Sequence, residues 1–403
     1  MKSFVNDSFI QVARFLSFAA IPSLIFIPSG ALIVLLILLL SIVGISLEFN
    51  RGYFHLDNFE KFFILSFVIY FLIVFISVLL NSGQLRDLDT ASRFILVLPI
   101  FLYFRRNRIG NQVLLYGLYV TAILFVIETM FLKFLQISFL GFEVHIGILS
   151  LYGGIIGTTL VFSLSDHNSK IKNYLIYIIA ILTLVSSISW GGRGVWLALL
   201  PTMLLLIKLK YQLKKIIAGI VFLTTLIVVS FFISPLGIEK KINDTYDELS
   251  MILANNTQSA SIGRRVELIK VSLDIFKENK LIGIGENQFK SKIDNEFEIR
   301  KWPNEVKNIN HPHNELMASL VEQGITGLAS LLMVLIYPIY YAINLLSHNK
   351  NNEKETLLFF IITIVVMYFF YGFTNGIFDH QNTTTFFASM LAITFGIVNY
   401  KED

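Results

Sequence analysis

The chain has 403 residues, of which 55% are hydrophobic and only 15% are charged, whereas about 25% of the residues of a typical soluble domain are charged. Because the apolar residues come in long blocks, this composition excludes an ordinary soluble domain and indicates an integral membrane protein. The formal net charge of +4 is small, and the absence of cysteine excludes disulfides, thiolate metal sites and cysteine nucleophiles.

Apolar segments along the chain predict membrane-spanning helices, because a helix needs about 20 apolar residues to cross about 30 Å of hydrocarbon. The twelve expected spans cover residues 10–27, 31–48, 62–81, 91–104, 112–132, 145–164, 174–190, 194–208, 215–234, 314–345, 356–378 and 383–400. The tenth segment is too long for one straight crossing and is expected to begin outside the bilayer. The predicted fold is therefore an all-α integral membrane protein with about twelve transmembrane helices.

Three parts follow from this division of the chain. Residues 1–235 are expected to carry transmembrane helices 1–9, and residues 313–403 to carry helices 10–12. Between them, residues 236–312 form one large loop before helix ten. No small-residue cleavage site follows Lys2, so the first span is expected to remain as an anchor.

Positive charges predict the orientation of these spans, because an even number of spans puts both termini on one side. Sixteen basic residues fall on the side of the termini: Lys2, Arg14, Arg51, Lys61, Arg105, Arg106, Arg108, Lys170, Lys172, Lys208, Lys210, Lys214, Lys215, Lys350, Lys354 and Lys401. Four fall in the short loops and span ends of the other side: Arg86, Arg93, Lys133 and Arg193. The positive-inside rule therefore predicts cytoplasmic termini and an extracytoplasmic long loop.

The long loop is expected to contain two amphipathic helices, because its apolar residues recur at helical spacing. The first set is Ile238, Ile242, Tyr246, Leu249 and Leu253, and the second is Val266, Ile269, Leu273 and Phe276. The loop has twelve basic and twelve acidic residues, so it does not favour nucleic acid. Its "LIGIGENQF" turn is too short and wrongly placed for a nucleotide-binding loop, and we expect no nucleotide.

Arginines at two predicted helix starts lie on this outer face. Arg264 and Arg265 fall in the first turn of the second amphipathic helix, in "SIGRRVELIK", and Arg193 falls at the start of the eighth span, in "WGGRGVW". A cation there opposes the helix dipole, whereas arginine and a helix start both attract phosphate. The alternative interpretations are a solvated arginine pair and an arginine that anchors its span at the membrane interface.

His311, His313 and Asn314 fall where the long loop re-enters the membrane, on the same face as the three arginines. A histidine with an ordinary pKa near 6.5 is suited to proton transfer, although a lone histidine is often a structural hydrogen-bonding residue. A zinc site at His311, His313 and Glu315 is disfavoured, because no second cluster of ligands completes it, and we expect no metal.

Three stretches of the sequence resemble, in order, the signatures of one family. They are "SISWGGRGVWLALLP", "SIGRRVELIKVSLDIF" and "HPHNELMASLVEQGITGL". They are similar to the O-antigen ligase and O-antigen polymerase superfamily of bacterial inner-membrane glycosyltransferases, which also has twelve spans and a large periplasmic loop before span ten. The last stretch is the most specific of the three. One departure is that Gly191 and Gly192 stand where the family commonly has Ser or Thr before its first arginine.

This resemblance implies transfer of a glycan from undecaprenyl diphosphate to an acceptor hydroxyl on the periplasmic face of the inner membrane. In the ligases the acceptor is an outer-core sugar of lipid A-core. The family's arginines fall on Arg193 and Arg265 and its histidine on His313. We expect these three to be catalytic, with the arginines holding the diphosphate and His313 acting as the general base, without a metal or cofactor.

Further residues are assigned to substrate binding. Arg264, His311 and Asn314 adjoin the catalytic residues, and Arg86 and Arg93 lie near the start of the fourth span on the correct face. For Arg86 and Arg93 the alternative is anchoring at the interface, or ion pairing with Asp87 and Asp89.

Other activities remain open besides ligation. An O-antigen or related polysaccharide polymerase shares the same motifs and topology, and a protein O-oligosaccharyltransferase is a third possibility. A flippase or transporter of lipid-linked sugars would explain twelve spans, but it predicts polar residues at mid-membrane instead of on one face, and the sequence has no internal repeat. The expected partners are thus the lipid-linked glycan donor, the lipid A-core acceptor and membrane lipids.

Overall fold

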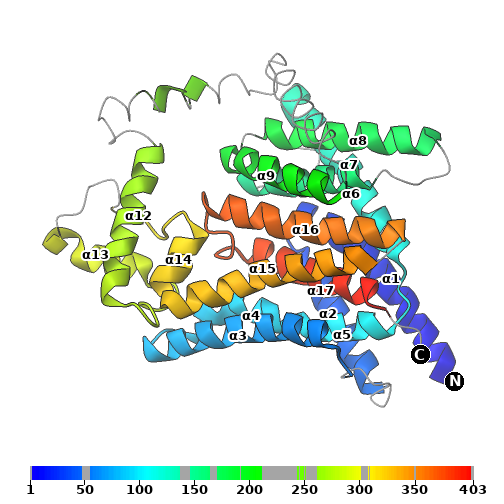
Figure 1. Ribbon diagram of the computed structural model, residues 1–403, viewed down its shortest axis with the longest axis horizontal. Helices are drawn as coiled ribbons and strands as arrows, with labels where there is room; N and C mark the ends of the chain where they lie inside the picture. Colours follow the sequence, from blue (N-terminus) through cyan, green and yellow to red (C-terminus); the bar gives the residue numbers. More distant parts are fainter. Residues whose placement is uncertain are drawn as a thin grey trace.

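A computed structural model describes residues 2–47, 55–136, 146–163, 170–190, 192–210, 243–244, 246–248, 250, 261–300, 307, 309–348 and 351–400. Every regular element in these ranges is a helix, as the sequence predicts. The elements bear the labels α1 (Lys2–Phe26), α2 (Ala31–Leu47), α3 (Asn58–Leu80), η2 (Leu85–Leu88), α4 (Asp89–Leu96), α5 (Leu98–Arg106), α6 (Asn111–Met130), η3 (Phe131–Leu135), α7 (Ile146–Phe162), α8 (Lys170–Ser189), α9 (Arg193–Lys210), α12 (Ser261–Glu278), α13 (Phe289–Arg300), α14 (Glu315–Glu322), α15 (Gly324–His348), α16 (Asn352–Gly372) and α17 (Gln381–Val398) (Figure 1).

Six of the described helices are long and apolar enough to cross a membrane. They cover Asp7–Phe26, Asn58–Leu80, Asn111–Lys133, Ile171–Ser189, Gly324–His348 and Asn352–Gly372. Two shorter apolar helices cover Ala31–Leu47 and Gly147–Phe162. The all-helical membrane class is therefore confirmed, whereas the count of twelve spans stays a prediction, and the expected ninth span, residues 215–234, lies outside the described residues.

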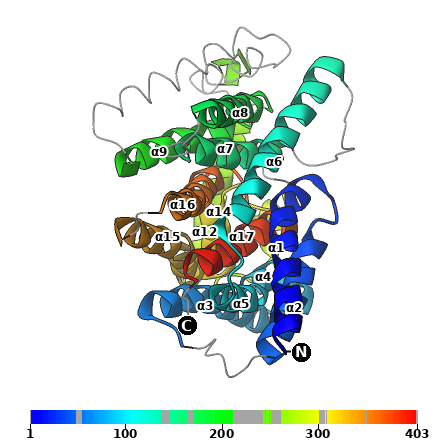
Figure 2. The same ribbon diagram turned by 90° about the vertical axis from the view of Figure 1, so that its right-hand side faces the viewer.

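Helices α16 and α17 form the centre of the bundle. In the end-on view, α15 lies beside them on one side, α3 to α5 and the pair α1 and α2 on two others, and α6 to α9 on the last (Figure 2). Almost every side chain of α17 from Thr383 to Val398 is buried, and α16 is buried over most of its length. A helix that is apolar on all sides belongs in such a centre.

The expected fourth span, residues 91–104, is two short helices. Helix α4 ends at Leu96 and α5 begins at Leu98, with Pro99 in its first turn. Proline lacks the N–H that would continue the preceding helix and disfavours helical geometry in the residue before it. The expected span is therefore divided into two helices at Val97.

The expected tenth span is also divided, between α14 and α15 at Gln323. Gly324 has a left-handed φ of +71°, and a Cβ there would lie 2.4 Å from the backbone carbon of Leu281. The return after α12 is pinned to this break, because Ile284 donates from its backbone N–H to the Val321 carbonyl at 3.0 Å and Ile325 donates to the Lys280 carbonyl at 2.8 Å. Only the part from Gly324 qualifies as a span, which agrees with an expected start outside the bilayer.

Helices α12, α13 and α14 form a small unit at the end of the bundle where α15 begins, away from both termini (Figure 1). Its core consists of Leu268, Val271, Ile275, Phe289, Ile293, Phe297 and Val321. The predicted amphipathic helix with Val266, Ile269, Leu273 and Phe276 is α12, and Val266 and Leu273 on it are exposed. Residues 268, 271 and 275 have helical spacing as well, and they face α13 and α14. Most of the other predicted amphipathic helix, Ile238 to Leu253, lies outside the described residues.

At the opposite end of the bundle, a buried ion pair ties α3 to α5. The carboxylate of Glu60 accepts a hydrogen bond from Nε of Arg105, and Nη2 of Arg105 donates to the His55 carbonyl at 2.6 Å. Both side chains are almost fully buried, and Glu60 also forms a capping box with Asp57 at the start of α3. This pair fixes two helix ends to each other.

Candidate functional site

Residues 373–380, the connection between α16 and α17, contact two of the predicted elements of the site, the start of α9 and the start of α14. A Cβ on Gly194 would lie 2.0 Å from Oγ1 of Thr374, so the start of α9 packs directly on this connection. The start of α14 is bound to it as well, because Oε2 of Glu315 accepts hydrogen bonds from the backbone N–H groups of Ile377 and Phe378 at 2.6 and 3.0 Å. Segments far apart in sequence therefore meet here.

Arg193 is the first residue of α9, as the sequence predicts. Its Nη2 lies 3.1 Å from Oε1 of Glu248, an ion-pair partner that the sequence reasoning missed. Position 194 requires glycine, because a Cβ there would collide with Oγ1 of Thr374. Gly192 packs at close range on Ser150. The predicted tight reversal thus serves to bring the helix start against its neighbours, although Gly191 lies outside the described residues.

Arg265 lies on the first turn of α12 and is half-buried, whereas Arg264 beside it is exposed. Burial lowers the pKa of the Arg265 guanidinium, and the positive charge of Arg193 lowers it further. The two arginines are thus close enough to repel each other, although they come from helices about 70 residues apart in sequence. Like charges held together in this way favour binding of an anion between them.

His313 joins the same group of charges. Burial, His311, Arg265 and Arg264, in that order, lower the pKa of His313 to about 4. The prediction of a histidine with an ordinary pKa is therefore corrected, because the sequence could not show these neighbours. At neutral pH the His313 imidazole is neutral, so it can accept a proton, and an anion near the arginines would raise its pKa again.

Local backbone geometry orients the two histidines. His313 has a left-handed φ of +53°, which is uncommon for a residue other than glycine and is often found at functional sites. Its backbone N–H donates to Nδ1 of His311 at 3.1 Å, and the ring centroids are 4.1 Å apart. Nδ1 of His311 also lies 3.6 Å from Oδ2 of Asp379 on the α16–α17 connection.

Asn314 is buried and caps α14. Its Oδ1 accepts a hydrogen bond from the Met317 backbone N–H at 3.1 Å, and its Nδ2 donates to the Phe373 carbonyl at 3.4 Å. The amide oxygen therefore caps α14, while the amide nitrogen joins α14 to the α16–α17 connection. This geometry gives Asn314 a positioning role, while its predicted contact with substrate stays a prediction.

Arg86 and Arg93 lie beside this group and not within it. Arg86 is exposed on η2, and Nη2 of Arg93 pairs with Oδ1 of Asp89 at 2.9 Å. The other oxygen of Asp89 accepts a hydrogen bond from Nε2 of Gln381, the first residue of α17. Within the described ranges, neither arginine forms a hydrogen bond or ion pair with Arg193, Arg265 or His313.

An acidic group next to the histidines was missed by the sequence reasoning. It comprises Glu286, Glu315, Glu322 and Asp379. Burial and the nearby charge of Asp379 raise the pKa of both Glu286 and Glu315 to about 8. Glu315 and Glu322 both lie in the "HPHNELMASLVEQGITGL" stretch, so this stretch was the part of the sequence from which the acidic group could have been predicted.

Metal binding finds no support in the geometry of this acidic group. The ranges covered by the structure contain no group of three or more His, Cys, Asp or Glu side chains arranged to hold a metal ion. Glu315 instead joins the start of α14 to the α16–α17 connection through two backbone hydrogen bonds, and Asp379 of this connection lies beside His311.

Fold and site together define a multi-pass membrane protein with a cationic, histidine-containing site at one end of its bundle. Residues 175–332 match the family model for O-antigen ligase, and this match includes Arg193, Arg264, Arg265 and His313. The match supports the predicted resemblance to the O-antigen ligase superfamily.

A relative in Haemophilus influenzae covers more of the chain than the family model does. This uncharacterized protein is 28% identical over 306 residues, which span 72% of this chain and 75% of the relative. The similarity therefore extends well beyond the three signature stretches, but it brings no described activity with it.

Proposed function

We propose that the protein is an O-antigen ligase, which transfers the glycan from undecaprenyl diphosphate to an outer-core sugar hydroxyl of lipid A-core on the periplasmic face of the inner membrane. The observation that carries this proposal is the proximity of Arg265 to both Arg193 and His313. Two guanidinium groups beside a neutral imidazole match what this reaction requires, which is a grip on a diphosphate next to a proton acceptor.

The arginines stabilise the leaving group. As the bond between the anomeric carbon and the diphosphate oxygen breaks, the electron pair and the negative charge pass to undecaprenyl diphosphate. Guanidinium groups that already lie near each other offset this charge with little rearrangement, and such preorganisation is commonly the largest contribution to catalysis. The ion pair of Arg193 with Glu248 holds one of these groups in place before the donor binds.

His313 activates the acceptor. Its neutral imidazole removes the proton of the sugar hydroxyl while the oxygen forms a bond to the anomeric carbon, a step worth about 10²- to 10⁴-fold in rate. A bound diphosphate offsets the positive charges of Arg264 and Arg265, which lower the pKa of His313 in the free protein. Donor binding therefore makes His313 a stronger base at the moment when a base is needed.

A polymerase of the same superfamily is the second candidate, because the family match applies equally to it. It would use the same site and donor, but its acceptor would be a second lipid-linked glycan. In both cases the site is periplasmic and both termini are cytoplasmic, in keeping with the distribution of positive charge.

Reconstitution tests the proposal. The purified protein in liposomes is given lipid-linked O-antigen and rough lipopolysaccharide, without nucleotide and with a chelator present. A ligase attaches the glycan to the lipopolysaccharide under these conditions. Longer lipid-linked chains formed from the donor alone would instead identify a polymerase, and a strict need for nucleotide or metal would reject the proposal.

A further inference from the structure

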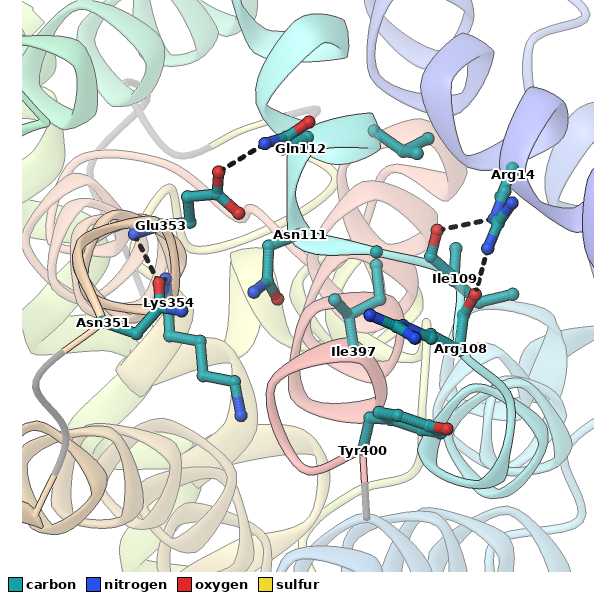
Figure 3. A pocket seen from close by; sticks show the side chains of 12 residues that line it. Arg14, Arg108, Ile109, Asn111, Gln112, Asn351, Glu353, Lys354, Ile397 and Tyr400 are labelled. Carbon is teal, nitrogen blue, oxygen red and sulfur yellow. Dashed lines mark hydrogen bonds between the residues drawn. The ribbon is translucent and has the colours of Figure 1, made fainter. Parts of the chain in front are cut away.

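A cavity lies at the opposite end of the bundle from His313. Its volume is about 450 Å³, and it is enclosed by the connection from α5 to α6, the start of α16 and the end of α17, with Arg14 of α1 at its edge (Figure 3). None of the residues of the proposed glycosyl-transfer site lines it. It is therefore separate from that site.

Positive charge dominates the lining of this cavity. Arg14, Arg108 and Lys354 contribute three cations, against one carboxylate from Glu353. Oε1 of Glu353 already accepts a hydrogen bond from Nε2 of Gln112 at 2.7 Å. The Lys354 ammonium has no hydrogen bond or ion pair to any residue within the described ranges. Among the described residues that line the cavity, cations therefore outnumber carboxylates by three to one.

Arg14 and the start of α6 add directed donors to this charge. Nε and Nη2 of Arg14 donate to the carbonyls of Ile109 and Arg108 at 3.0 and 2.7 Å, which uses two of its five N–H donors and fixes the connection. Gly110 stands at the cap position of α6 with a φ of +94°, so no side chain covers the first backbone N–H groups of this 20-residue helix. The first turn of α6, residues 111–113, lines the cavity.

These observations specify a phosphate-bearing anion. Arginine, lysine and uncovered helix N–H groups are the donors that recognise phosphate oxygens. Apolar side chains border the cavity, since Val113 and Ile397 line it, and the exposed Phe15 and Tyr116 lie on the same two helices, α1 and α6, as Arg14 and Gln112. A free phosphate does not pack against apolar side chains, whereas the acyl chains of a lipid do.

We propose that this cavity binds the headgroup of an anionic phospholipid, with the acyl chains along α1 and α6. In the orientation given above the cavity faces the cytoplasmic leaflet, where anionic lipids attract basic residues. The lipid would join α1, α6, α16 and α17 at the end of the bundle remote from the glycosyl-transfer site. This proposal does not depend on which glycan the protein transfers.

Lipid titration tests the proposal. Dioleoyl phosphatidylglycerol is titrated onto the full-length protein in detergent and counted by native mass spectrometry. The variant R108Q/K354Q should bind it about 25-fold more weakly, because each basic residue near an anionic headgroup contributes about fivefold. The matched control K61Q/K208Q also removes two positive charges, but from exposed lysines outside the cavity, and it should bind as the native protein does.

Two further measurements complete the test. Inorganic phosphate in tenfold excess over the lipid should not displace it, and both variants should keep the native melting temperature. Should R108Q/K354Q prove unstable, K354Q alone is used, with an expected loss of about fivefold. Equal binding by the cavity variant and the native protein, equal losses in both double variants, or displacement by phosphate would overturn the proposal.

Discussion

The two ends of the bundle use buried charge in opposite ways. Near the termini, Arg105 is 1% exposed and paired with Glu60, and the result is a closed contact between α3 and α5. At the other end, Arg193 and Arg265 lie near each other and Arg265 lies near His313, and the side chain of Arg193 keeps 34% of its surface exposed although it pairs with Glu248. Arg105 is thus buried against one opposite charge, whereas Arg193 and Arg265 also repel each other and stay partly exposed.

This difference shows what distinguishes a structural arginine from a ligand-binding one in a membrane protein. A buried pair recovers the cost of leaving water through its partner, so it has nothing left to offer a ligand. Repelling cations raise the energy of the empty site, and a bound anion removes that cost. The comparison therefore predicts that variants at one end change stability, while variants at the other change catalysis and binding.

The largest effect is expected from His313→Ala. Transfer should fall by about 10²- to 10⁴-fold, because the acceptor hydroxyl loses its base, while donor binding is retained. Turnover and donor affinity are measured on the purified variant. His348→Ala, which removes an exposed histidine at the end of α15, serves as the control and should leave turnover unchanged. Normal turnover by His313→Ala would refute its assigned role.

Glu60→Ala should affect stability instead. Removing the carboxylate leaves Arg105 charged and buried, at a cost of about 3–5 kcal/mol in the free energy of unfolding. A lower melting temperature in detergent, with unchanged turnover per folded molecule, is the expected result. The double variant E60L/R105M should recover most of the loss, because no unpaired charge remains. A loss of turnover without a loss of stability would contradict this separation of roles.

Arg265→Ala should weaken donor binding by about 10- to 100-fold, because charge-assisted hydrogen bonds to the diphosphate are lost. Arg193→Lys is also expected to bind and react poorly, since an ammonium cannot reproduce the two-pronged contact of a guanidinium. Lys270→Ala on the same helix as Arg265 is the matched control, because Lys270 is exposed. Donor affinity equal to that of the native protein in Arg265→Ala would remove this residue from the site.

The smallest effect concerns pH. His313 has a pKa of about 4 in the free protein, so kcat/KM should hold through neutral pH and fall only as the pH drops toward that value and the imidazole becomes protonated. Arg264→Gln removes a positive charge that lowers this pKa, and it should move the acidic limb to higher pH. The measurement is a pH-rate profile of both proteins. A shift of the acidic limb to lower pH in the variant would contradict the prediction.

The sequence predicted the positions of Arg193, Arg265 and His313 better than the packing around them, because each stands in a signature stretch at the start of a helix. Their catalytic roles stay predictions. The buried face of α12 was not found, since residues 266, 269 and 273 and residues 268, 271 and 275 both have helical spacing. The choice depends on Phe289 and Val321, which lie outside that helix.

Other features depend on contacts that no local pattern contains. The low pKa of His313 arises from burial, from His311 and from arginines on another element. The pair of Arg193 with Glu248 joins residues 55 positions apart. Physical reasoning from the sequence could place these residues on one face, but only the folded chain shows which of them meet.

The pinned break between α14 and α15 has a mechanical consequence. Backbone hydrogen bonds at this break join the return after α12 to the first turn of α15, so the segment carrying His313 is coupled to the inclination of α15 in the bilayer. Arg193 is carried by a different helix. Membrane thickness would set the inclination of α15. It would thereby change the distance between His313 and a diphosphate held by Arg193.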